Sequence, residues 1–183
     1  RYWRDWSSDV CSSDLLSAEE AVAGAPAHPY YWADLAERWA SEGRVEEARV
    51  AFARALERSR DVPQIWLRCA NFHFALNEPE AALRLGARVI RLVPDYDEVL
   101  FSYFERFGLE PERVLAELGE EARPAQAYFR YLLGADDLGS AARVWTHLVG
   151  QQWATLPLAV AYLEVLARRR EWGKAGAVWS AWL

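Results

Sequence analysis

The sequence predicts an all-α fold, an α-solenoid built from about five helix–turn–helix hairpins. Residues of one kind recur at an interval of 34, as Trp32 and Trp66 do near one end and Trp145 and Trp179 near the other. Within each interval the apolar residues follow the spacing of an amphipathic helix. No stretch alternates apolar and polar residues as a half-buried strand does, so we expect no sheet.

The repeat units are expected at 29–62, 63–96, 97–121, 122–155 and 156–183. In the first unit, Pro29 opens a helix whose apolar face includes Trp32 and Trp39. Gly43 follows where the end of a helix favours a residue with positive φ. A second helix carries Ala48 and Phe52 on its apolar face. Small residues such as Ala48 allow two helix axes to approach closely.

The second unit repeats this order from Pro63, with Cys69 expected in the core. Its turn contains Asn77, which we expect to cap the following helix, with Glu80 three positions later. The third unit departs from the pattern. Its second helix, Pro111 to Leu118, is only about two turns long. This hairpin is therefore expected to be shortened, with a kink near residues 108–124.

Residues 1–15 differ from everything that follows them. The segment WSSDVCSSDL, from Trp6 to Leu15, resembles a short-read sequencing adapter translated in frame, and it has no helical or strand period. We interpret 1–15 as a non-native segment left by the assembly of a metagenomic, bacterial sequence, with a native tail as the alternative. Residues 16–27 would be a linker or the end of a truncated preceding repeat, and the repeat domain would occupy 28–183.

The composition narrows the classes of partner. Hydrophobic residues make up 52% of the 183 residues, enough for a buried core. The net charge of -6 argues against a nucleic-acid platform, which needs a basic face. The longest apolar run, Leu156 to Leu163, is far shorter than the roughly 20 residues of a membrane span. Because the sequence contains no Met, we expect a fragment, and no localisation can be read from it.

The pattern resembles the tetratricopeptide repeat, a helix–turn–helix unit of about 34 residues. The matching residues of the first unit are Trp32, Leu35, Ala36, Trp39, Ala48, Phe52 and Ala55. The later units match at Trp66, Cys69, Ala70, His73, Ala82, Pro94, Tyr128, Phe129, Leu132, Ala141, Trp145, Leu148, Tyr162, Leu163, Leu166, Ala175, Trp179 and Trp182. The resemblance implies a right-handed superhelix over about 28–183. It also implies a concave groove lined by the first helix of each hairpin.

No motif for catalysis or cofactor binding is present. The glycines near Lys174 lack the spacing of a phosphate-binding loop. His28, His73 and His147 lie far apart, without Cys or carboxylates at metal-ligand spacing. We therefore expect no enzyme activity, no cofactor and no metal.

The family resemblance implies which side chains line the groove and bind a protein or peptide partner. These are Glu37, Leu67, Arg68, Asn71, Phe74, Phe101, Glu105 and Arg130. An apolar side chain of a peptide would contact Leu67, Phe74 and Phe101, while Arg68 and Arg130 would pair with its carboxylates. The resemblance also implies that Arg123, Gln126, Leu133 and Arg168 face the groove in the later units.

The function expected from these residues is a non-catalytic scaffold or adaptor that binds a protein partner. An RNA-binding helical repeat is one alternative, weakened by the acidic charge balance. The regulatory or organising part of a larger envelope- or polysaccharide-assembly enzyme is another. The apolar helix near the C-terminus, with Trp172, Trp179 and Trp182, also suggests self-association through an open helix face.

Overall fold

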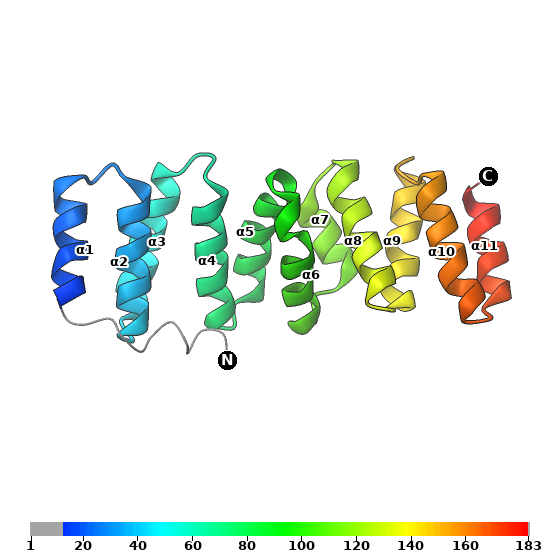
Figure 1. Cartoon of the computed structure of the whole chain (residues 1–183), viewed down its shortest axis with the longest axis horizontal. Coiled ribbons are helices and arrows are strands. Elements are labelled where there is room, and N and C mark those ends of the chain that lie inside the picture. Colours follow the sequence, from blue (N-terminus) through cyan, green and yellow to red (C-terminus); the bar gives the residue numbers. More distant parts are fainter. Residues whose placement is uncertain (1–12, 183) are drawn as a thin grey trace. The chain divides into compact units, whose positions relative to one another are not determined.

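The computed structural model describes residues 13–182, and within that range it contains helices and no strand. Most of the segment interpreted as non-native, residues 1–12, lies outside the described residues. The chain divides into two compact units, Arg1–Val89 and Ile90–Leu183. The all-α helical-repeat fold expected from the sequence is confirmed, and Figure 1 shows helix following helix along the chain.

The first unit is built from α1 (Ser13–Gly24), α2 (Pro29–Ser41), α3 (Val45–Arg58), α4 (Pro63–Ala75) and most of α5 (Pro79–Leu92). α2 packs closely against α3, and α4 contacts both. Their shared core contains small, aliphatic and aromatic side chains: Ala33, Ala36, Ala48, Ala51, Phe52, Ala55, Ile65, Cys69 and Phe72. The alanines expected at the helix crossings are buried, as is Cys69, and burial raises the pKa of its thiol to about 12.

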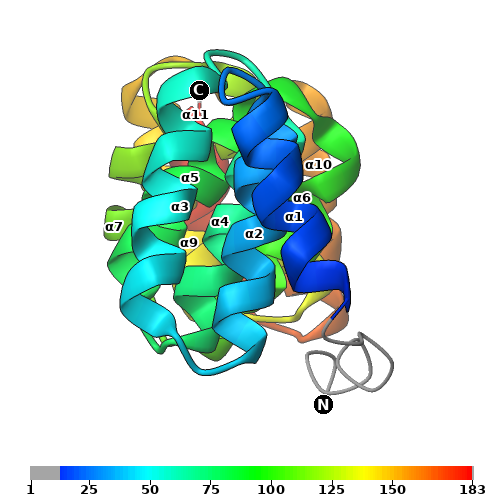
Figure 2. The same cartoon turned by 90° about the vertical axis from the view of Figure 1, so that its left-hand side faces the viewer.

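α1 lies beside α2, as both ribbon views show (Figures 1 and 2). It begins at Ser13, so the last residues of the segment interpreted as non-native belong to a helix. The short connection to α2 is held by two donors to the Pro26 carbonyl, the Trp32 indole at 2.8 Å and the Arg58 guanidinium at 2.7 Å. Residues 16–27 therefore include a helix that packs on the first repeat unit.

The second unit contains a 3₁₀ turn, η2 (Pro94–Tyr96), followed by six α-helices: α6 (Asp97–Arg106), α7 (Pro111–Leu118), α8 (Ala122–Gly134), α9 (Leu138–Gly150), α10 (Leu156–Arg168) and α11 (Trp172–Trp182). The short helix α7 has the bounds that the sequence predicted. Gly119, with φ +84°, ends it, and Arg91 donates to the Glu117 carbonyl at 2.7 Å. Aromatic rings of α6, α8, α9 and α10 form much of this unit's core.

The turns inside the hairpins share one backbone conformation. Gly43 has φ +78°, as expected, and Asn77, 34 residues later, has φ +59°. Asp136 and Arg170 repeat this at φ +63° and +57°. The sequence-based assignment of Asn77 as the cap of α5 is therefore wrong. Asn tolerates the left-handed region, and here it closes the turn before a helix that begins at Pro79.

Candidate binding surface

The predicted binding residues of the first compact unit, Arg1–Val89, lie on α2 and α4. Leu67 and Asn71 are half-buried and one turn apart on α4, so they share one face of that helix. Phe74 is only 6% exposed. Almost none of its surface reaches solvent, and its contact with a ligand stays a prediction.

Arg68 is held by carboxylates of the neighbouring hairpin. Its Nε donates to Glu37 at 2.7 Å, and its Nη2 donates to Glu37 at 2.7 Å and to Asp34 at 2.6 Å. Burial by itself lowers the pKa of Arg68, but the hydrogen bonds to Glu37 and Asp34 outweigh it and raise the pKa above its usual value. The ion pair between Arg68 and Glu37 thus joins α4 to α2, and each side chain supplies the hydrogen-bond partner of the other.

A second polar cluster joins α3 to the turn before α5. The Arg49 guanidinium donates to both oxygens of Glu78, one of them at 2.9 Å. Nδ1 of His73 lies 2.8 Å from Glu78. The bond from Arg49, followed by that from His73, lowers the pKa of Glu78 to about 2. This cluster was not predicted, because Arg49 and Glu78 lie far apart in the sequence.

The predicted binding residues of the second compact unit, Ile90–Leu183, differ in their exposure to solvent. Phe101 is fully buried, with its ring centroid 4.9 Å from that of Tyr128 and 5.6 Å from that of Tyr131. α8 covers its ring, and its contact with an apolar side chain of a peptide stays a prediction. Glu105 is exposed and accepts a hydrogen bond from the Tyr131 hydroxyl at 2.5 Å. Arg130 is exposed and has no ion pair within residues 13–182.

Two other side chains expected in the groove hold the second unit together. Arg123 donates to Asp97 at 2.6 Å and also to the Ile90 carbonyl. Burial raises the pKa of Asp97 although Arg123 opposes the shift. Gln126 donates to the carbonyl of Trp153 at 2.8 Å. Both side chains therefore form hydrogen bonds that link elements within the second compact unit.

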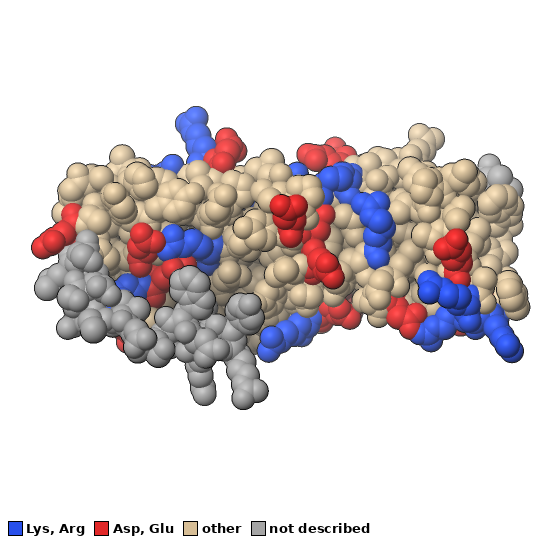
Figure 3. Space-filling model, in the orientation of Figure 1, with Lys and Arg blue, Asp and Glu red and all other residues tan. Residues whose placement is uncertain are grey.

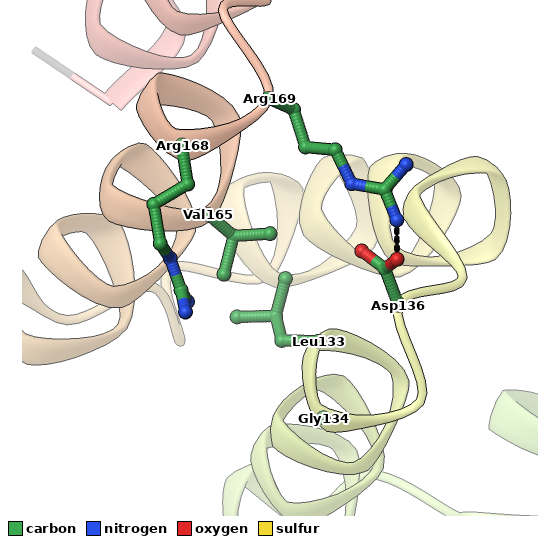
Figure 4. Close-up of a pocket in the computed structure, with 6 residues that line it drawn as sticks. All are labelled: Leu133, Gly134, Asp136, Val165, Arg168 and Arg169. Carbon is green, nitrogen blue, oxygen red and sulfur yellow. Dashed lines mark ion pairs between the residues drawn. The ribbon is translucent and has the colours of Figure 1, made fainter.

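A cleft of about 430 Å³ lies where α8 and α10 end. Its lining comes from Leu133, Gly134, Asp136, Val165, Arg168 and Arg169. Figure 4 shows the two aliphatic side chains facing each other, with Arg168 on one side and an Arg169–Asp136 ion pair on the other. Arg168 makes no ion pair with any described residue. The cleft thus combines apolar walls with one uncommitted guanidinium.

The charged side chains on the face drawn in Figure 3 are mixed in sign. Acidic and basic groups lie next to one another, with uncharged surface between them. Within residues 13–182, no three His, Cys, Asp or Glu side chains converge as a metal site would require. No described helix is long and apolar enough to cross a membrane.

The fold and these surfaces define a helical-repeat protein, and one comparison with known proteins specifies the repeat. Residues 40–100, from the end of α2 to the start of α6, match the family model of the tetratricopeptide repeat. The resemblance predicted from the sequence is confirmed over this range. No curated protein matches the chain. Tetratricopeptide repeats generally mediate interactions between proteins.

Proposed function

We propose that this chain is a non-catalytic scaffold that binds an extended peptide segment of a protein partner at the cleft between α8 and α10. The observation that carries the proposal is the arrangement of Arg168 beside Leu133 and Val165. A guanidinium without a carboxylate partner favours an anionic ligand group, and the two aliphatic side chains favour an apolar neighbour. The matching peptide carries an aliphatic residue next to Asp, Glu or a C-terminal carboxylate.

Arg130 extends this surface along α8. It lies three residues before Leu133, so both side chains are on one face of the helix. Arg130 is exposed, and although its charge also acts on Asp97, we take it as the second cation offered to a ligand. Leu67 and Asn71 remain proposed contact residues in the first unit. Arg68 and Glu37 have a smaller part in the proposal, since each already satisfies the other.

The test is selection of short peptides from a displayed random library with the full chain as bait. We expect selected sequences to place Leu, Ile or Val beside an acidic residue. A selected peptide, synthesised with a fluorophore, should bind R168A about tenfold more weakly than the unchanged chain, equivalent to about 1.4 kcal/mol. R113A is the matched control, because Arg113 is an exposed arginine on α7 that does not line the cleft.

Two results would contradict the proposal. Selected peptides could bind R168A and R113A as tightly as the unchanged chain, which would place the peptide site elsewhere. Alternatively, selection could yield no acidic–aliphatic sequence while the chain retains RNA in a parallel experiment, which would favour the RNA-binding alternative.

A further inference from the structure

An ion pair between Asp136 and Arg169 forms one side of the cleft that contains Leu133 and Val165 (Figure 4). Asp136 lies in the turn between α8 and α9, and Arg169 directly follows the last residue of α10. Both side chains are about half exposed, so a ligand can reach them. A ligand in the cleft therefore meets a guanidinium that already has a carboxylate partner.

The hairpin turn closes without this carboxylate. The backbone N–H of Asp136 donates to the Leu133 carbonyl at 3.3 Å, and φ at Asp136 is +63°. Gly43 and Asn77 close their own turns in the same way, each with a positive φ and a bond to the carbonyl three residues earlier. Glycine has no side chain, so the turn itself does not require an acidic residue at this position. What Asp136 adds is its contact with Arg169.

The charges around the cleft match one negative charge of a ligand. Two arginines and one aspartate line it, which leaves one net positive charge. Arg168 forms no ion pair with a described residue, although Glu164 lies one turn before it on α10. The next acidic residue, Asp137, accepts a hydrogen bond from the Ser140 backbone N–H at 3.0 Å and so caps α9. A ligand with a second negative charge finds no second unoccupied guanidinium in this lining.

Building on the peptide site proposed above, we infer that Asp136 makes the cleft selective for a singly charged carboxylate over a doubly charged phosphoryl group. The carboxylate of a ligand pairs with Arg168, while Asp136 keeps Arg169 occupied. A phosphoserine carries a charge of about −1.5 to −2 and three acceptor oxygens, which favour two guanidiniums. To reach Arg169 it must displace Asp136 and then lie beside that carboxylate, where like charges repel.

The experiment compares two synthetic fluorescent peptides that differ in one residue. One places Leu next to Asp, and the other places Leu next to phosphoserine. Their binding to the full chain is measured by fluorescence anisotropy. We expect the unchanged chain to bind the Asp peptide at least as tightly as the phosphoserine peptide. D136N releases Arg169, so it should bind the phosphoserine peptide at least about tenfold more tightly, while its affinity for the Asp peptide changes by about threefold or less.

D136N keeps the turn, because Asn77 has the same left-handed backbone in an earlier hairpin. D137N is the matched control. It removes the same charge one residue along the chain, and Asn can still cap α9 as Asp137 does. Its preference between the two peptides should stay within about twofold of that of the unchanged chain. Adding R169A to D136N should remove the gain for the phosphoserine peptide.

The outcomes separate this inference from the proposed function. If R168A weakens binding of the Asp peptide but D136N and D137N shift the preference equally, the peptide site stands and the selective role of Asp136 is wrong. A gain in D136N that persists after R169A is added would overturn that role too. If neither peptide binds the unchanged chain or D136N at sub-millimolar concentration, the peptide site itself fails, and the selectivity of Asp136 fails with it.

Discussion

At the scale of single residues, one backbone conformation recurs at equivalent positions that carry different residue types. The turns closed by Gly43 and Arg170 share a left-handed φ, although only the first has a glycine. A side chain in this region crowds the following carbonyl, and the cost is on the order of 1 kcal/mol. The repeated turn therefore keeps its shape while its residue varies.

Arg170→Gly is expected to stabilise the chain by up to about 1 kcal/mol, because it removes this crowding at an exposed site. The free energy of unfolding in urea measures the change. Gly43→Ala is the reverse control. No atom lies within 4 Å of the added Cβ, so any loss must come from the backbone rather than from a clash. A loss of stability in Arg170→Gly would contradict the argument.

Glu78 should make the stability of the fold depend on pH. The pKa of Glu78 in the folded chain is about 2, below its ordinary value of 4.5. Its ion pair with Arg49 therefore contributes stability above about pH 4.5, and this contribution is lost as the pH falls toward 2. E78Q should be less stable than the unchanged chain by no more than about 1 kcal/mol near pH 7, since the pair is partly solvated.

The difference between E78Q and the unchanged chain should shrink as thermal unfolding is followed from pH 7 down to pH 3. E46Q is the control, because Glu46 also pairs with Arg49 but is 84% exposed and reaches it only at 3.4 Å. A pH-independent difference for E78Q would show that the carboxylate charge contributes nothing.

At the scale of helices, the pairing of α2 with α3 depends on small side chains. Ala48 is fully buried in the core that α2, α3 and α4 share. Ala48→Phe should destabilise the chain by about 1–3 kcal/mol through overpacking. Ala53→Phe, on an exposed position of the same helix, should change the unfolding free energy by about 0.5 kcal/mol or less. Equal losses in both variants would point to helix propensity instead.

At the scale of the whole molecule, charge decides which partners are attracted. The net charge is -6, and most arginines named above are paired with carboxylates or carbonyls. Acidic residues outnumber basic ones, so the chain has no excess of cations to displace counterions from a phosphate backbone. We expect no binding of a single-stranded RNA oligonucleotide at about 0.15 M salt, measured by anisotropy. Binding that strengthens steeply as salt is lowered would contradict this expectation.

Several local features could be predicted from the sequence alone. The short helix at Pro111–Leu118, the left-handed Gly43 and the buried alanines follow from spacing and from the chemistry of single residues. The cap assigned to Asn77 failed at the same scale, because capping and turn closure favour the same residue type. Only the helix bounds show which of the two roles it has.

The candidate site could be predicted only in part, because the burial and the ion pairing of its residues depend on side chains of other hairpins. The 34-residue period and the helical spacing of apolar residues determine by themselves that this chain is an all-α repeat, since both can be read from the order of residue types alone. The tertiary structure decided that Phe101 is covered by α8 and that Arg68 is held by Glu37. It also decided that Arg168 is left unpaired beside a cleft and that Asp136 pairs with Arg169. Burial and ion pairing depend on residues about one repeat away, so a local sequence pattern cannot predict which side chains are buried or paired.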